Sequence, residues 1–383
     1  MSHDGDELVV LEETFAGQGV GVEAEPDELE AGIKPWDPEK IRVSTKSFSL
    51  RNVLDMIDSK DLELAPDFQR NRVWKARQKS RLIESLLLQI PLPAFYFAED
   101  VDGMLRVVDG LQRLSTIHSY VREQNLALED LEYLHTSEGQ IFDELSPALQ
   151  RRLNNAQIVV HVIDPTTPDE VKYDIFKRIN TGGEPLNGME IRHCMSRPRS
   201  RAFLRRCVQS DQFQRATNGT LRDHVRMHDR EAALRFIAFR LLGNVDRYED
   251  FGSLERLLDW AAAQLDDPKL VADNVLDQLF TGFEQAMFNA ELLFGAHAFR
   301  KWSTWNERLS PINRALLESW GYALAEANPA ALAVAREEIV SEARKAMTQD
   351  YRYIESISSS TSDARRVRER FAKPQAILKG ALE

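Results

Sequence analysis

The sequence contains little cysteine, no long apolar run and no lysine or arginine in its first 33 residues. Its two cysteines, Cys194 and Cys207, exclude a disulfide framework and lack the spacing of zinc ligands. No stretch approaches the roughly 18–20 apolar residues that a membrane helix needs. The acidic N-terminus lacks the basic-then-apolar order of a signal peptide. These absences predict a cytoplasmic protein with no membrane partner.

The composition fits a globular protein of two domains. The 383 residues are 43% hydrophobic and 29% charged, and a domain takes about 100–200 residues. The net charge of −12 argues against wide non-specific binding to nucleic acid. Ten acidic residues within positions 1–33 predict an acidic flexible tail over residues 1–34. The arginine-rich stretch 192–230 is consistent either with a local basic face or with solvated helix faces.

Hydrophobic periodicity predicts a mixed α/β domain over residues 35–198. The expected helices are 50–57, 77–91 and 112–121, and the expected strands are 94–100, 103–110 and 157–164. In the second helix Ile90 is expected to face inward, and Asp102-Gly103 predicts a hairpin turn. Two further helices begin after the capping residues Thr167 and Asn187, and Glu190 completes a capping box with Asn187.

Strand signals fade after about residue 198. The remaining pattern predicts helices at 229–243, 253–265, 273–296, 310–326, 329–347 and 362–372. The predicted layout is therefore a tail (1–34), a mixed α/β domain (35–198) and a helical domain (199–383). This layout belongs to the α+β class.

A possible ligand site lies in the segment VVDGLQRLSTIHSY, residues 107–120, between a predicted strand and a predicted helix. A helix N-terminus presents unpaired N–H groups and a partial positive charge. Gly110 would let a ligand approach the backbone, and Arg113 would offer a forked cation suited to phosphate. Asp109, at the end of the strand, could hold Mg²⁺ or position a water molecule. These residues predict a phosphate site, although an Asp-Gly turn in which Arg113 only pairs with Asp109 explains them as well.

One bend cannot provide all of the binding energy. Micromolar affinity requires about 8 kcal/mol, whereas a helix terminus contributes about 0.3–1 and a charge-assisted hydrogen bond about 1.5–3 kcal/mol. Other groups must therefore converge on the ligand. Candidates on loops at the ends of elements are Gln69 and Arg70 in PDFQRNRVW, and Arg178 and Asn180 in FKRINTGG.

Four segments carry a resemblance to a known family. PDFQRNRVW, LIESLLLQIPLPAFYF, VVDGLQRLSTI and FKRINTGGEPLNGMEIRHC stand in the order and spacing of that family. The sequence resembles the N-terminal domain of GmrSD-type modification-dependent restriction systems, a family of prokaryotic defence proteins whose fold is related to ParB and sulfiredoxin. The later segments RMHDREAALRFIAFR, INRALLESW and SISSSTSDARRVRERF also resemble it, so the resemblance covers roughly 36–372.

The resemblance implies a nucleotide-phosphate site at the strand–turn–helix bend, and some members hydrolyse nucleoside triphosphates. Asp109, Gly110, Gln112 and Arg113 match the family's Asp-Gly-Gln-Gln-Arg box. On this basis Asp109, Gln112 and Arg113 are the expected catalytic residues, and Asp109 is the expected Mg²⁺ ligand. Leu111 departs from the box because glutamine is usual there, which puts hydrolysis in doubt if that glutamine contacts the base or the attacking water.

Two further boxes add residues to the expected site. Gln69 and Arg70 match a Phe-Gln-Arg box, and Arg178, Asn180 and Gly183 match an Arg-Ile-Asn-x-Gly-Gly box. The full set of expected nucleotide-binding residues is Gln69, Arg70, Gly110, Arg113, Arg178, Asn180 and Gly183. The nucleotide itself, whether GTP, CTP or ATP, stays open.

The sequence lacks the HNH-like nuclease signature that full-length restriction members carry. His224 and His228 are four residues apart and could hold a metal, but a basic helix end explains them better. The spacing of Arg113 and His118 fits a ribonuclease pattern that arises easily by chance.

The leading hypothesis is a Mg²⁺-dependent nucleoside triphosphatase that regulates an effector encoded separately. The effector activity could instead come from a second copy of the chain, in a homo-oligomer. One alternative is a nuclease or nickase that acts on foreign or modified DNA. Another is a non-catalytic adaptor that senses DNA or a phage product.

Overall fold

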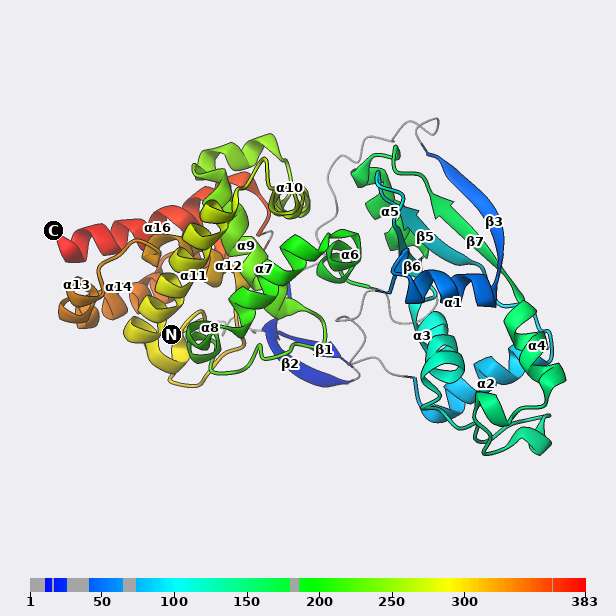
Figure 1. Ribbon diagram of the computed structural model, residues 1–383. Coiled ribbons are helices and arrows are strands. Elements are labelled where there is room, and N and C mark those ends of the chain that lie inside the picture. Colours follow the sequence, from blue (N-terminus) through cyan, green and yellow to red (C-terminus); the bar gives the residue numbers. More distant parts are fainter. Residues whose placement is uncertain (1–10, 16, 26–40, 65–73, 180–185, 360) are drawn as a thin grey trace. The chain divides into compact units, whose positions relative to one another are not determined.

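The computed structural model describes residues 11–15, 17–25, 41–64, 74–179, 186–359 and 361–383 (Figure 1). The chain forms two compact units. Residues 34–195 make the α/β unit, and residues 196–383 with the N-terminal segment up to residue 33 make the helical unit. A five-stranded sheet together with many helices places the chain in the α+β class.

The α/β unit is built on a sheet with the strand order β3-β7-β5-β6-β4. The strands are β3 (Val43–Ser49), β4 (Leu62–Glu63), β5 (Phe95–Glu99), β6 (Leu105–Asp109) and β7 (Gln157–Ile163). The predicted hairpin is confirmed, because β5 and β6 pair antiparallel. At its turn Gly103 has a φ of 84° and donates its N–H to the carbonyl of Asp100 at 2.9 Å. β7 runs antiparallel to β3 and parallel to β5.

The helices of the α/β unit pack against this sheet and against one another. They are α1 (Leu50–Asp58), α2 (Ala76–Leu87), α3 (Leu111–His118), α4 (Pro147–Asn155), α5 (Asp169–Ile179) and α6 (Gly188–Met195). Short helical turns cover Ser119–Glu123, His135–Ser137 and Phe142–Glu144. The prediction for Ile90 is wrong: α2 ends at Leu87, Gln89 takes a positive φ of 60°, and Ile90 is 49% exposed.

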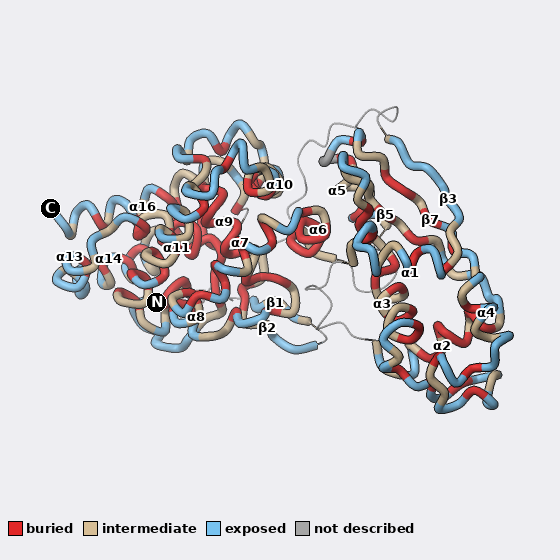
Figure 2. Tube along the Cα trace, in the orientation of Figure 1, coloured by how far each residue is buried: buried red, intermediate tan, exposed pale blue. Residues whose placement is uncertain are grey.

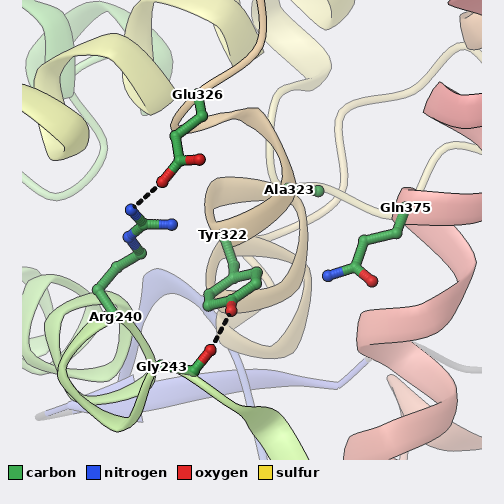
Figure 3. Close-up of a pocket in the computed structure, with 6 residues that line it drawn as sticks. All are labelled: Arg240, Gly243, Tyr322, Ala323, Glu326 and Gln375. Atoms are coloured by element: carbon green, nitrogen blue, oxygen red, sulfur yellow. Dashed lines mark hydrogen bonds and ion pairs between the residues drawn. The ribbon is translucent and has the colours of Figure 1, made fainter.

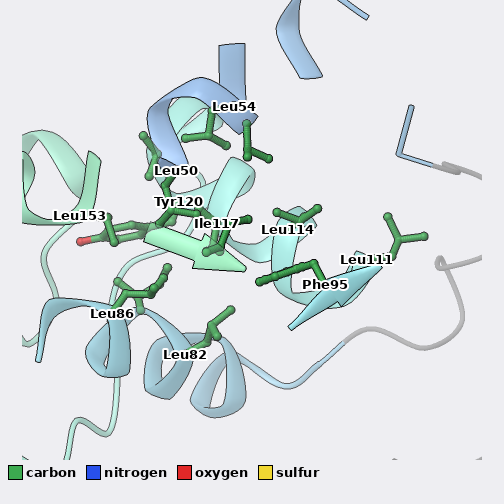
Figure 4. Close-up of a cluster of buried hydrophobic side chains, with 14 of the residues drawn as sticks. Leu50, Leu54, Leu82, Leu86, Phe95, Leu111, Leu114, Ile117, Tyr120 and Leu153 are labelled. Carbon is green, nitrogen blue, oxygen red and sulfur yellow. The ribbon is translucent and has the colours of Figure 1, made fainter. Parts of the chain in front are cut away.

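Apolar side chains from α1, α2, α3 and the sheet form one core (Figure 4). Leu54, Leu86, Phe95 and Ile117 are all at most 3% exposed. Burying each such side chain contributes about 1.5–3 kcal/mol, so this core stabilises the elements on both sides of the bend between β6 and α3.

The helical unit is arranged around α9 (His228–Leu242), which is buried along most of its length (Figure 2). Its other helices are α7 (Pro198–Gln209), α8 (Asp211–Ala216), α10 (Leu254–Asp266), α11 (Asp273–Phe294), α12 (Arg314–Leu324), α13 (Pro329–Val334), α14 (Arg336–Gln349), α15 (Tyr351–Ser356) and α16 (Ala364–Leu382). Three short turns cover Val245–Asp250, Gly295–His297 and, between α8 and α9, residues 217–223.

The N-terminal segment differs from the expected flexible tail wherever the structure describes it. β1 (Glu12–Phe15) and β2 (Gln18–Glu23) form an antiparallel hairpin. The N–H of Glu23 donates to the carbonyl of Ile312 at 2.9 Å, and Val22 is fully buried. The prediction of flexibility is therefore wrong for this stretch, because its acidic side chains find cationic partners far along the chain. The other residues of the expected tail, 1–34, lie outside the described residues.

Candidate functional site

The bend between β6 and α3 has the geometry of an uncapped helix start. Gly110 is the N-cap residue, with the left-handed angles φ 93° and ψ 9° and no side-chain cap. Its carbonyl accepts the N–H of Leu114 at 2.9 Å, which closes the first turn of the helix. The N–H groups of such a first turn point outward and carry a partial positive charge.

Gly110 is required for a reason other than the one expected. A Cβ at this position would lie 2.2 Å from Cδ1 of Phe95 and 3.1 Å from Nη2 of Arg113. The ring of Phe95 therefore packs directly against Gly110 and leaves no room for a side chain at this position. The glycine is explained by its positive φ and by this close packing.

Arg113 lies in a local ion pair. Its Nη2 is 2.8 Å from Oδ2 of Asp109 and 3.2 Å from the carbonyl of Ala94, and its Nη1 donates to the carbonyl of Pro93. The guanidinium carbon lies 4.1 Å from the centroid of the Phe95 ring, and the side chain is 12% exposed. Burial lowers the pKa of Arg113, and the Asp109 carboxylate opposes that shift. Arg113 thus ties the start of α3 to the chain that enters β5, instead of turning its fork toward a phosphate as expected.

Asp109 keeps one oxygen available. Its side chain is 32% exposed, and Oδ2 pairs with Arg113. Among the described residues Oδ1 has no partner. Mg²⁺ is commonly held by one or two carboxylates together with substrate phosphates and water. One free carboxylate oxygen beside a helix N-terminus fits that pattern, whereas the described residues contain no group of three His, Cys, Asp or Glu side chains that could hold a metal alone.

The structure places four of the expected residues at one bend: Asp109 ends β6, Gly110 is the N-cap residue, and Gln112 and Arg113 lie in the first turn of α3. Gln112 is half-buried in the first turn of α3. Arg178 is exposed in the last turn of α5. The other expected site residues, Gln69, Arg70, Asn180 and Gly183, lie outside the described residues.

A row of polar side chains that the sequence prediction missed runs across the sheet to Asp109. In the sheet register Thr45 lies opposite His161, His161 lies beside Tyr96, and Tyr96 lies opposite Asp109. His161 Nδ1 is 2.9 Å from Thr45 Oγ1, and the Tyr96 and His161 ring centroids are 4.8 Å apart. The alternation along residues 157–163 places His161 on the face opposite Val160 and Val162, and this signal could have identified it.

The arginine-rich stretch 192–230 makes many internal contacts. Arg199 donates to the carbonyls of Leu265 at 2.6 Å and Val271 at 2.7 Å. Arg206 pairs with Asp277 at 2.8 Å. These contacts favour the interpretation as helix faces over that of a basic face for DNA.

The histidine hypotheses receive little support. His118 is 3.1 Å from Asp58, in a contact between α3 and α1. His224 donates from Nε2 to the carbonyl of Val20 at 3.0 Å, and its Nδ1 accepts the N–H of Arg226 at 3.1 Å. Both ring nitrogens of His224 are therefore engaged, which leaves none for a metal.

A pocket in the helical unit is lined by Arg240, Gly243, Tyr322, Ala323, Glu326 and Gln375 (Figure 3). Arg240 pairs with Glu326 at 2.5 Å, and the Tyr322 hydroxyl donates to the carbonyl of Gly243 at 2.8 Å. Its strongest polar groups thus satisfy one another, and the pocket offers little to a ligand.

The bend, the sheet register and the core define an α/β domain with an uncapped helix start next to an acidic strand end. Residues 50–195 match the family described as GmrSD restriction endonuclease, N-terminal domain, and this part of the chain belongs to that family. The match points to a component of a restriction or defence system. No curated protein matches the chain. Within the described residues, every helix is too short or too polar to cross a membrane.

Proposed function

We propose that the α/β unit binds a nucleoside triphosphate at the N-terminus of α3 and hydrolyses it with Mg²⁺, and that it thereby regulates a separate effector of a prokaryotic defence system. The proposal rests on two neighbouring features: a helix start whose N-cap residue is a glycine with no side-chain cap, and Oδ1 of Asp109, which has no partner among the described residues. Membership of the GmrSD N-terminal family supports the defence context.

Each residue of the bend has a defined role in this proposal. The first-turn N–H groups of α3 would donate hydrogen bonds to phosphate oxygens, as helix N-termini commonly do. Asp109 would hold Mg²⁺, which neutralises the charge that develops on the phosphates. Arg113 is a positioning residue, because it holds Asp109 and the entry to β5 in place. Gln112, in the first turn, would orient the phosphate or the attacking water.

Tyr96 and His161 extend the site along the sheet. Cross-strand neighbours have Cβ atoms about 5 Å apart, so Tyr96 lies one strand away from Asp109. An aromatic ring in this position would stack on the base or the ribose of the nucleotide. Replacing Tyr96 with alanine should weaken binding of a nucleoside triphosphate more than binding of inorganic triphosphate, which has no base.

Phosphate release from each of the four ribonucleoside triphosphates tests hydrolysis, with and without DNA. We expect Mg²⁺-dependent release by the full chain and loss of at least about 90% of it in Asp109→Asn, since one protein ligand to the metal is removed. Asp130→Asn is the control: its carboxylate is 59% exposed in an ion pair with Arg77. Equal release by Asp109→Asn and the control would contradict the role of Asp109.

A non-catalytic sensor is the second candidate. Leu111 stands where glutamine is usual in GmrSD-type N-terminal domains. Its side chain is 7% exposed and belongs to the apolar core of the α/β unit. A buried leucine cannot contact a base or a water molecule in the site. Tight nucleotide binding without phosphate release would favour this candidate.

A further inference from the structure

The N-terminal hairpin contacts the helical unit through carboxylates. We call residues 11–15 and 17–25 the acidic hairpin, and we call His228, Arg235 and Arg314 the cationic pocket. These three pocket residues come from α9 and α12.

Two glutamates of the hairpin enter the pocket. Glu13 places Oε1 2.7 Å from Nη2 of Arg314 and Oε2 2.7 Å from Nε2 of His228. Glu25 binds Arg235 with both oxygens, at 2.8 and 2.5 Å. Paired contacts of this kind are the strong, directional form of a charge-assisted hydrogen bond.

The charges of hairpin and pocket balance. The side chains of His228, Arg235 and Arg314 are at most 5% exposed. Within the helical unit, Glu231 contacts all three. Glu318 also lies 3.8 Å from Arg235, but it pairs with the buried Arg370, so these two charges offset each other. With His228 protonated, Glu231 against the three cations leaves two positive charges, and these match Glu13 and Glu25. A buried charge without a partner is strongly unfavourable, so an emptied pocket must take up other anions.

Backbone contacts set the register of the docked hairpin. The N–H of Ile312 donates to the carbonyl of Gly21 at 2.8 Å, next to the bond from Glu23 back to Ile312. A Cβ on Gly21 would lie 2.3 Å from Cγ2 of Thr220, so the hairpin fits closely at this point. Glu23 adds contacts to Lys301 at 2.5 Å and Asn313 at 2.9 Å.

The order of the chain gives this docking a consequence. The acidic hairpin precedes the α/β unit in the sequence, and the cationic pocket follows it. The α/β unit is therefore joined to the helical unit twice, once through residues 26–40 and once at residues 195–196. Docking of the hairpin closes a loop of chain that contains the whole α/β unit.

We propose that the cationic pocket is a docking site for an acidic peptide, and that the acidic hairpin is its exchangeable occupant. Release of the hairpin opens one of the two connections to the α/β unit and leaves a site that accepts another pair of carboxylates. The inference is independent of nucleotide binding.

A nicked full-length protein tests this proposal. A protease site is introduced between residues 26 and 40 and cleaved. A labelled synthetic peptide of residues 8–27 is then added in excess. Gel filtration shows whether the N-terminal fragment stays with the rest of the protein. We expect the fragment to stay bound and to exchange with the peptide. A peptide carrying Glu13→Gln and Glu25→Gln should compete at least about 100-fold more weakly, since both negative charges that face the cationic pocket are lost.

Controls separate charge from general stability. In the nicked protein, Glu13→Gln with Glu25→Gln should release the fragment, whereas Glu249→Gln with Glu326→Gln should not. The latter carboxylates are 55% and 78% exposed in surface ion pairs of the same unit. Two results would overturn the proposal: a fragment that leaves only when the helical unit unfolds, or equal competition by the charged and neutral peptides.

Discussion

At the scale of single residues, Gly110 occupies a position in the bend between β6 and α3 that has no room for a larger side chain. Its φ is 93°, and a Cβ added at this position would lie only 2.2 Å from a ring carbon of Phe95. The sequence indicated the turn, since Asp-Gly before a helix is a common bend. It could not indicate the contact with Phe95, because that residue is brought to the bend by the pairing of β5 with β6.

We predict that Gly110→Ala lowers the free energy of unfolding by more than about 2 kcal/mol, because backbone strain and overpacking add. Gly103→Ala is the matched control. Gly103 has a similar φ of 84° but open space around its would-be Cβ. Its loss should be about 1 kcal/mol. Urea unfolding measures both, and equal losses would show that the Phe95 contact does not constrain the bend.

Arg113 was the residue whose role the sequence left most open. Both a phosphate contact and a pair with Asp109 were consistent with the spacing of four residues. The structure shows the pair, together with the bonds to two backbone carbonyls. We predict that Arg113→Ala lowers the free energy of unfolding by about 2–3 kcal/mol, since the Asp109 charge and those carbonyls lose a donor.

The measurement is again urea unfolding, here combined with nucleotide binding. Arg113→Lys should recover part of the stability, because it restores the charge without the fork. If Arg113→Ala unfolded like the wild type while losing nucleotide binding, the guanidinium would be a direct phosphate ligand and the positioning role would be wrong.

At the scale of elements, local patterns predicted local structure well. The capping box of α6 is confirmed: Asn187 N–H donates to Glu190 at 2.7 Å, and Glu190 N–H donates to Asn187 Oδ1 at 2.8 Å. The β5–β6 hairpin followed in the same way from its turn residues. Both motifs involve residues a few positions apart, which is why the sequence alone was enough.

The acidic hairpin was missed for the opposite reason. Its glutamates lie more than 200 positions from Arg235 and about 300 from Arg314. Taken alone, a stretch of ten acids without cations is typical of a disordered tail. Pairings between distant segments leave no periodic signal in a single sequence.

The hairpin contacts predict a pH dependence. His228 faces Glu13 from β1, Glu231 from its own helix and Arg314 from α12, and its ring centroid lies 4.7 Å from that of His224. Desolvation by burial lowers the pKa of His228. The contacts with Glu13 and Glu231 outweigh it, and they raise the pKa above its ordinary 6.5. The partners of Glu13 lower its pKa from 4.5 to about 2.

The direction of each pH effect follows from the linkage between protonation and stability. The contribution of His228 is present below pH 6.5 and is lost as the pH rises through its raised pKa. The contribution of Glu13 is present above pH 4.5 and is lost as the pH falls toward about 2. Retention of the fragment in the nicked protein should therefore be greatest between about pH 4.5 and 6.5. Retention that did not change from pH 6 to 9 would contradict a role for the His228 charge.

At the scale of the whole molecule, the two units differ in how much is known about them. The family match covers residues 50–195, within the α/β unit. The resemblance of the later helical segments to the same family stays a prediction.

The unit boundary lies between residues 195 and 196, whereas the sequence placed it between 198 and 199. The site was predictable as a bend with an acid and a glycine, but the partners of Arg113 and the row through Tyr96 needed the sheet register.

Equilibrium binding of nucleoside triphosphates to the full chain tests the central claim most directly. Each labelled triphosphate is titrated with and without Mg²⁺ against the wild type, Asp109→Asn and Asp130→Asn. We predict micromolar, Mg²⁺-dependent binding of at least one triphosphate by the wild type and by Asp130→Asn, and at least about tenfold weaker binding by Asp109→Asn. Failure of the wild type to bind all four triphosphates, or equal affinity in Asp109→Asn, would contradict a nucleotide site at the start of α3.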